Sequence, residues 1–132
     1  MSKLYAFLHP KTEGLAKDIV VSDRFADEEG NVQPFSIKAL TQEDNDRITR
    51  LSMKKTSKGE EELDSVEYSR RVVIEGTTFP DFRNQELAVQ YGTMDPLEVP
   101  GKMLPGGEYK ILMKEIMALS GFKPNPKTEA KN

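Results

Sequence analysis

The pattern of apolar and polar positions predicts strands in the first third of this chain. Residues 18–25 and 32–40 are rich in β-branched and aromatic side chains, and their apolar positions roughly alternate with polar ones. Such alternation is typical of half-buried strands. The polar run between them contains Gly30 and Asn31, which readily adopt the positive φ angles of tight turns. The sequence therefore predicts a β-hairpin over residues 18–40.

After residue 40 the apolar positions recur at helical spacing instead. Thr41 followed by Asp44 has the form of a capping box, so a helix is expected to begin there. Its basic residues extend to 54–55, where positive charge complements the carbonyl end of a helix. The polar, charged residues 56–62 are expected to form a loop.

A second helix is expected to begin at Asp64 and to end at Gly76. The β-branched run at 72–74 also fits a strand, so both interpretations stay open for that stretch. Residues 77–82 are expected to form a turn around a proline, and Asn84 is expected to cap a short helix after it.

The clearest helical signal lies near the end of the chain. A glycine followed by a phenylalanine at 121–122 indicates a Schellman-type helix end, in which the aromatic ring folds back on the last turn. In the segment before this end, mainly apolar residues recur every three or four positions and so form one stripe along a helix. The stripe consists of Tyr109, Leu112, Met113, Ile116, Met117 and Ser120.

Both ends of the chain differ from this central part. Residues 1–17 combine apolar side chains with a proline and a glycine, which predicts a flexible apolar arm. Residues 123–132 contain two prolines and no large apolar side chain, so a disordered tail is expected. The apolar side chains of the arm are Leu4, Tyr5, Phe7 and Leu8.

These patterns together predict one domain over residues 18–122, of the α+β class and mainly α-helical. The N-terminal hairpin at 18–40 would be followed by three to four helices within 41–122. The length of 132 residues fits one domain with little left over.

Composition narrows the classes of partner. The 19 lysines and arginines are nearly balanced by 22 acidic residues, giving a formal net charge of -3. No basic surface for nucleic acid or for an anionic membrane is expected from this balance. The apolar patch at the N-terminus is too short and polar-flanked for a signal peptide, and no apolar run is long enough for a membrane span. The lack of cysteine suits a reducing cytoplasm.

Candidate chemistry is sparse. His9 is the only histidine and cysteine is absent, so metal sites built from these residues are excluded and only an all-carboxylate site remains conceivable. The acidic run at 27–31 does not fit a calcium loop, because Phe25 would occupy the first ligand position. Gly106 and Gly107 lack the strand and the lysine of a phosphate-binding loop and fit a hinge or a loose cap instead. No catalytic, cofactor-binding or metal-binding residue is predicted, and no enzymatic activity is expected.

The remaining candidates are surfaces for protein contact. An apolar arm outside any firm element either folds against a partner or packs on its own domain, and the sequence leaves both open. Methionines in the final helix are primarily core residues and secondarily a pliable interface. The predicted partner-binding residues are Leu4, Tyr5, Phe7, Leu8, Met113 and Met117.

Several short segments, in their order and spacing, resemble one known family over residues 2–122. They are Leu4-Tyr-Ala-Phe-Leu, Val20-Val-Ser-Asp-Arg-Phe, Pro34-Phe-Ser-Ile-Lys-Ala-Leu-Thr-Gln-Glu-Asp-Asn, Pro80-Asp-Phe, Glu86-Leu, Tyr91-Gly, Asp95-Pro-Leu-Glu, Lys102-Met-Leu, Gly107-Glu-Tyr and Leu119-Ser-Gly-Phe. Together these segments resemble the tail assembly chaperones of the PBSX prophage (XkdN-like) type, from tailed bacteriophages and their remnants.

The resemblance implies a non-catalytic role without cofactors. Such proteins bind the tape measure protein, keep it in solution, help to bring tail tube subunits to it, and are absent from the mature virion. The resemblance thus implies work in the host bacterial cytoplasm, and some chaperones of this kind self-associate. The alternative from the sequence is a small structural tail or connector component of the virion.

Overall fold

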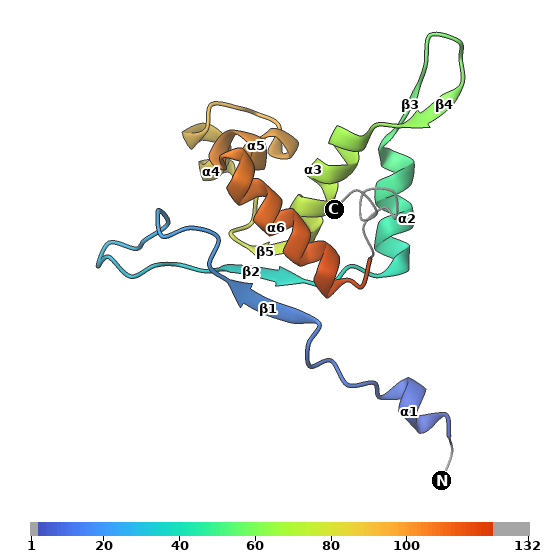
Figure 1. The fold of residues 1–132 in the computed structure, drawn as a ribbon, viewed down its shortest axis with the longest axis horizontal. Coiled ribbons are helices and arrows are strands. Elements are labelled where there is room, and N and C mark those ends of the chain that lie inside the picture. Colours follow the sequence, from blue (N-terminus) through green and yellow to red (C-terminus); the bar gives the residue numbers. More distant parts are fainter. Residues whose placement is uncertain (1–2, 123–132) are drawn as a thin grey trace, which may run out of the picture.

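The computed structural model describes residues 3–122 as a helical body packed on one face of a small sheet (Figure 1). The predicted tail at 123–132 lies outside the described residues. In chain order the elements are α1 (Tyr5–Leu8), β1 (Ala16–Ile19), β2 (Phe35–Lys38), α2 (Gln42–Leu51), β3 (Met53–Lys55), β4 (Glu61–Leu63), α3 (Ser65–Gly76), β5 (Thr77–Phe79), α4 (Gln85–Gln90), the 3-10 helix η1 (Pro96–Glu98), α5 (Val99–Met103) and α6 (Gly106–Leu119). No helix within the described residues is long and apolar enough to cross a membrane.

The three-stranded sheet has the order β1-β2-β5, and both pairings are antiparallel. The predicted pairing of the first two strands is present, but β1 begins at Ala16, two residues inside the predicted arm. The strands are also shorter than expected, and the connection at 20–34 is correspondingly long. Within that connection Ala26 and Val32 form an isolated bridge, and Gly30 adopts a φ of 88° in the turn. The turn therefore lies where the sequence places it.

The α+β class is confirmed, whereas the expected separation of an N-terminal hairpin from a purely helical remainder is wrong. Thr77–Phe79, predicted as part of a turn, pairs with β2 as the third strand. The described residues hold six α-helices, five of them after β2, against the three to four predicted there. The short helix α4 follows its predicted cap at Asn84, whereas α1 and α5, with four and five residues, are too short for a periodic pattern to reveal.

A second hairpin replaces the predicted loop at 56–62. The helix α2 ends at Leu51 instead of continuing to 54–55, and the chain then forms β3 and β4. The register places Lys54 opposite Glu62 and Lys55 opposite Glu61. Opposite charges on directly paired positions stabilise a hairpin without contributing any apolar alternation, so the hydrophobic pattern gives no sign of it. This hairpin projects from the body next to α2 and α3 (Figure 1).

The helix α3 is the centre of the core. Val72, Val73 and Ile74 are all buried, so the β-branched run lies in a helix and the strand alternative is wrong. Burial of these three consecutive side chains outweighs the weak intrinsic preference of valine and isoleucine for strands. α3 packs against α6, α2 and the α5 region.

The predicted helix caps at Thr41, Asp64 and Asn84 and the predicted end of α6 are confirmed. The Thr41 hydroxyl accepts a hydrogen bond from the Asp44 N–H at 3.1 Å, and the Asp44 carboxylate accepts one from the Thr41 N–H at 2.9 Å. Asp64 and Asn84 cap α3 and α4. At the end of α6, the N–H of Phe122 donates to the Met117 carbonyl at 3.0 Å, as in a Schellman motif.

Candidate partner-binding surfaces

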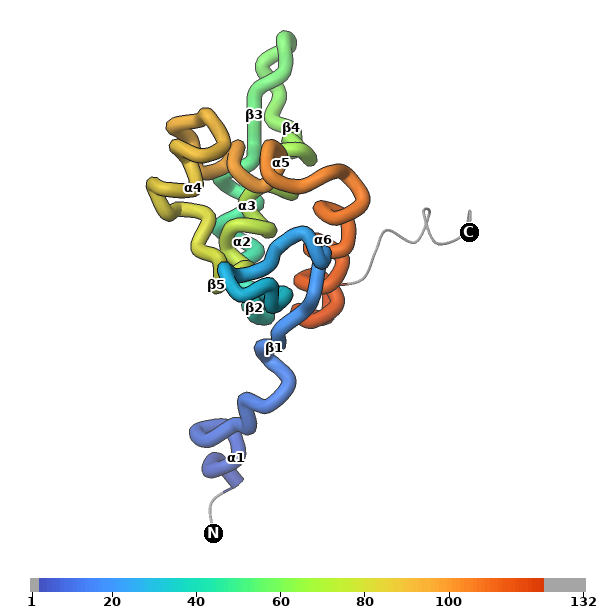
Figure 2. The backbone as a smooth tube through the Cα atoms, turned by 90° about the vertical axis from the view of Figure 1, so that its left-hand side faces the viewer, coloured from blue at the N-terminus to red at the C-terminus, as the bar shows by residue number. Residues whose placement is uncertain are grey.

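The N-terminal arm projects from the body. Helix α1 contributes no buried residue, and both views place it at the opposite end of the molecule from the β3–β4 hairpin (Figures 1 and 2). The apolar side chains of the arm are highly exposed: Leu4 58%, Tyr5 62%, Phe7 81% and Leu8 64%. Several large exposed apolar side chains on one short segment are typical of surfaces that dock on partners.

The two predicted methionines lie elsewhere. Met113 and Met117 are half-buried on α6 and pack against the core, away from α1 (Figure 1). Helical spacing puts both on the same side of α6 as Gly106 and Lys110. The structure therefore separates the predicted residues into an arm and a side of α6.

That side of α6 borders a groove of about 470 Å³ between α3, α5 and α6. Val66, Ser69 and Arg70 line it from α3, and Gly106, Tyr109 and Lys110 line it from α6. The spacing is i, i+3 and i+4 on both helices, so two helix ridges face each other across the groove. The Ser69 and Tyr109 hydroxyls are hydrogen-bonded at 2.8 Å and join the two walls. Val66 is 59% exposed.

The charged residues around this groove differ in whether they have an ion-pair partner. Arg70 and Lys110 have no ion-pair partner within residues 3–122. By contrast, Glu67 on α3 is bound by Arg71 at 3.1 Å, and Glu108 on α6 is bound by Arg24 at 2.6 Å. The hydrogen bond from Arg24 lowers the pKa of the Glu108 carboxyl. These two carboxylates are thus already paired, whereas Arg70 and Lys110 have no ion-pair partner among the described residues.

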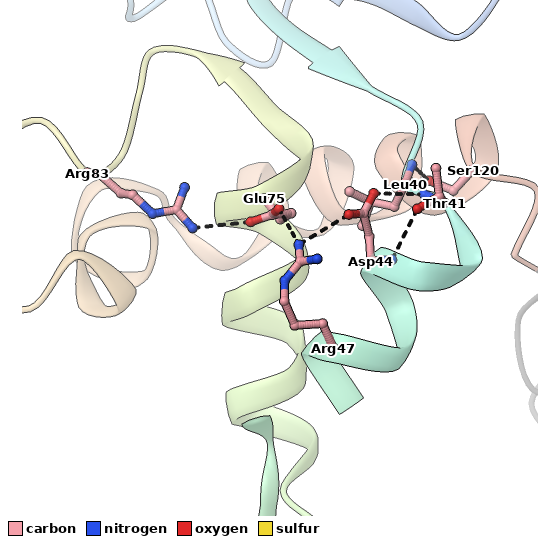
Figure 3. A network of polar contacts seen from close by, with 7 residues as sticks. All are labelled: Leu40, Thr41, Asp44, Arg47, Glu75, Arg83 and Ser120. Carbon is pink, nitrogen blue, oxygen red and sulfur yellow. Dashed lines mark hydrogen bonds and ion pairs between the residues drawn. The ribbon is translucent and has the colours of Figure 1, made fainter. Parts of the chain in front are cut away.

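A partly exposed polar network joins α2, α3 and the segment after β5 (Figure 3). Arg47 on α2 binds Asp44 at 3.1 Å and Glu75 of α3 at 2.5 Å, and Arg83 binds the other oxygen of Glu75 at 3.2 Å. The backbone N–H of Thr41 is the main cause of the lowered pKa of Asp44. Each charge in this network has a partner, and the network holds α2 against α3.

The same figure shows the contact that fixes the end of α6. The Ser120 hydroxyl accepts a hydrogen bond from the N–H of the buried Leu40 at 2.8 Å (Figure 3). It also donates one to the Ile116 carbonyl at 2.7 Å. Ser120 thereby ties α6 to the segment between β2 and α2.

The described residues offer little for chemistry. Residues 3–122 contain no group of three or more histidine, cysteine, aspartate or glutamate side chains placed to hold a metal ion. His9 lies in the exposed arm, where its ring stacks on Tyr5 with centroids 4.3 Å apart. Burial raises the pKa of Tyr68, whose hydroxyl donates to Asn45 between α3 and α2. The arrangement is suited to protein contact through the arm and the groove.

Comparison with known proteins agrees with a role in protein contact. Residues 4–131 match the family model described as phage XkdN-like tail assembly chaperone protein. This chain belongs to the XkdN-like tail assembly chaperone family. The resemblance expected from the sequence is therefore confirmed, and the family assigns this tail assembly chaperone a role in phage tail assembly.

Two relatives of this tail assembly chaperone come from Bacillus subtilis (strain 168). The phage-like element PBSX protein XkdN is 38% identical over 125 residues, which cover 86% of this chain and 82% of XkdN. The uncharacterized protein YqbN is 39% identical over 113 residues, covering 80% of this chain and 74% of YqbN. The crystal structure of YqbN has a TM-score of 0.76 at 33% identity and covers 93% of this chain and 99% of that chain. The fold is thus shared with a solved relative.

Sequence reasoning missed the groove of this XkdN-like chaperone. Its residues come from three helices, and a one-dimensional pattern does not show which helices lie side by side. One signal was available: Gly101 lies within α5, and Gly106 and Gly107 lie in the first turn of α6, where no turn requires glycine. The sequence interpretation of Gly106 and Gly107 was a hinge or a loose cap.

Proposed function

We propose that this protein is a non-catalytic tail assembly chaperone that binds the phage tape measure protein and helps to recruit tail tube subunits. It acts in the host bacterial cytoplasm and leaves the assembly before the virion matures. The match of residues 4–131 to the chaperone family carries this proposal. The partner-binding residues proposed for it are Leu4, Tyr5, Phe7, Leu8, Met113 and Met117.

The exposed arm supports this proposal physically. A protein that keeps an aggregation-prone client in solution must cover the apolar segments of that client while its own surface stays polar. Helix α1 presents its apolar side chains outside the core, so they are available without unfolding of the domain. Methionine side chains on the half-buried side of α6 adapt to differently shaped client residues. The same arm offers a route to self-association.

Co-expression with the tape measure protein of the same phage tests the proposal. We expect the tape measure protein to remain soluble only when this chain is present, and the two to elute together from a sizing column. A variant lacking residues 1–10 serves as a matched control, because α1 contributes nothing to the core. An insoluble tape measure protein in the presence of the intact chain would refute the proposal.

Mass spectrometry of purified particles tests the proposed departure from the virion. The chaperone function predicts no stoichiometric copy of this chain in finished tails. A fixed number of copies per tail would instead indicate the structural component considered above.

A further inference from the structure

The groove between α3, α5 and α6 has the features of a docking site for one kind of segment. We propose that it binds an amphipathic helix of a partner protein, with acidic side chains flanking an apolar or small-residue stripe. This inference rests on the proposed function: it assigns the client a second binding site, separate from the arm, and specifies the charge pattern of the client helix that binds there.

The shape of the groove favours a helix over an extended strand. Its two long walls are the ridges of α3 and α6, and no strand edge borders it. An extended peptide would therefore leave its backbone N–H and C=O groups without partners on the walls, whereas a helix satisfies them internally. The exposed Val66 offers apolar surface to such a helix.

Two glycines keep the groove open. A Cβ atom added to Gly101 or to Gly106 would meet no atom within 4 Å, so nothing in the described chain fills the space above them. Both positions line the groove, and a partner backbone approaches glycine more closely than any other residue. Gly107 is equally free of neighbours and does not line the groove.

The charges select the partner. Arg70 and Lys110 stand on opposite walls and have no ion-pair partner among the described residues. A helix with acidic side chains on both flanks would pair with each of them. The arm of a second copy of this chain fits poorly, because its apolar segment is flanked by Lys3 and Lys11. Charge complementarity therefore points to a different protein with acidic flanks.

Synthetic helices test this without the natural client. The probe is a fluorescent peptide of about 18 residues, roughly five helical turns, with an alanine/leucine stripe flanked by glutamates. Its matched partner carries lysines in place of the glutamates. Anisotropy titrations with the full chain are expected to show binding of the glutamate peptide at least about tenfold tighter than that of the lysine peptide. This preference should weaken as salt is added, because exposed charges are screened.

Variants of the chain locate the binding site. Gly101→Leu combined with Gly106→Leu fills the groove and is expected to weaken binding about tenfold or more, while Gly107→Leu leaves it unchanged. Arg70→Glu combined with Lys110→Glu is expected to reverse the preference toward the lysine peptide. Unchanged melting temperatures establish that each variant is folded.

Some results would overturn the inference. Equal binding by the groove-filled variant and the Gly107→Leu control would show that the peptide binds elsewhere. A preference for the glutamate peptide that persists after charge reversal would show that Arg70 and Lys110 do not cause it. Failure of the intact chain to solubilise the tape measure protein refutes the proposed function but leaves the peptide result standing. Conversely, if the chain binds neither peptide but still keeps the tape measure protein soluble, only the groove as the binding site of the client is refuted.

Discussion

The crossing of α3 and α6 depends on the absence of a side chain at Gly76. This residue is the last of α3 and is buried against Ile116, a fully buried residue of α6. A Cβ atom at position 76 would lie 2.5 Å from the Cγ2 atom of Ile116, 3.0 Å from its Cδ1 and 3.1 Å from its Cγ1. Carbon atoms pack favourably at about 3.5–4.0 Å, so a methyl group here requires a displacement of roughly 1 Å.

Ile116 has little freedom to provide that displacement. Its γ2 methyl is attached to a branched Cβ whose χ1 is restricted in a helix, so rotation does not clear the contact. Overpacking of this kind costs about 1–3 kcal/mol, against a gain of up to about 1 kcal/mol from replacing glycine by alanine in a helix. We therefore expect Gly76→Ala to lower the free energy of unfolding by about 1–2 kcal/mol.

Urea denaturation of Gly76→Ala, Ile116→Ala and the double variant measures this directly. Ile116→Ala alone should cost about 2–5 kcal/mol through the cavity it leaves, and the added methyl should fill part of that cavity. The double variant is thus expected to be less destabilised than the sum of the two. Gly101→Ala is the control, because its Cβ meets nothing and should be neutral or stabilising. A Gly76→Ala protein as stable as the Gly101→Ala control would refute the argument.

Three further predictions concern the fold and the arm. Ser120→Ala leaves the buried Leu40 N–H without its acceptor and should cost about 1–3 kcal/mol in urea titrations, with Ser120→Thr as the conservative control. Folding lowers the pKa of the Glu108 and Asp44 carboxyls from their ordinary values of 4.5 and 3.8. Their contribution to the free energy of unfolding is therefore complete above these ordinary pKa values and is lost as the pH falls through the lower pKa values of the folded protein. Glu108→Gln should make the acid-side decline in melting temperature shallower; an unchanged decline would contradict the assignment. Deletion of residues 1–10 should leave the melting temperature nearly unchanged while weakening client binding, and a large drop would show that the arm belongs to the core.

The parts of the fold that the sequence predicted are those encoded by neighbouring residues. The capping box at Thr41, the cap at Asp64 and the helix end at Gly121 each depend on side-chain and backbone groups a few positions apart, and all are present. The buried face of α6 likewise follows from spacing within one helix, with Leu112 and Ile116 at its centre.

The errors arose where distant segments decide the outcome. Thr77–Phe79 forms a strand because β2 offers an unpaired edge, and Val72 lies in a helix because its neighbours bury it on all sides. The β3–β4 hairpin places charged residues of opposite sign on paired positions, such as Lys54 opposite Glu62, and these positions carry no apolar pattern. Similarly, the groove exists only because α3 and α6 lie side by side, so the helical glycines Gly101 and Gly106 could hint at it but could not locate it.

The arm and the groove differ in how they would engage a client. The groove walls are held in place by the close contact of Gly76 with Ile116 and by the Ser69–Tyr109 hydrogen bond, so the groove is preformed and selects its occupant by shape and charge. Helix α1 contributes no buried residue, so binding through it would cost conformational freedom. When both engage one long client, binding at the first site raises the effective concentration at the second. For the proposed client, two individually weak contacts would therefore suffice for binding, and the loss of either one would favour release.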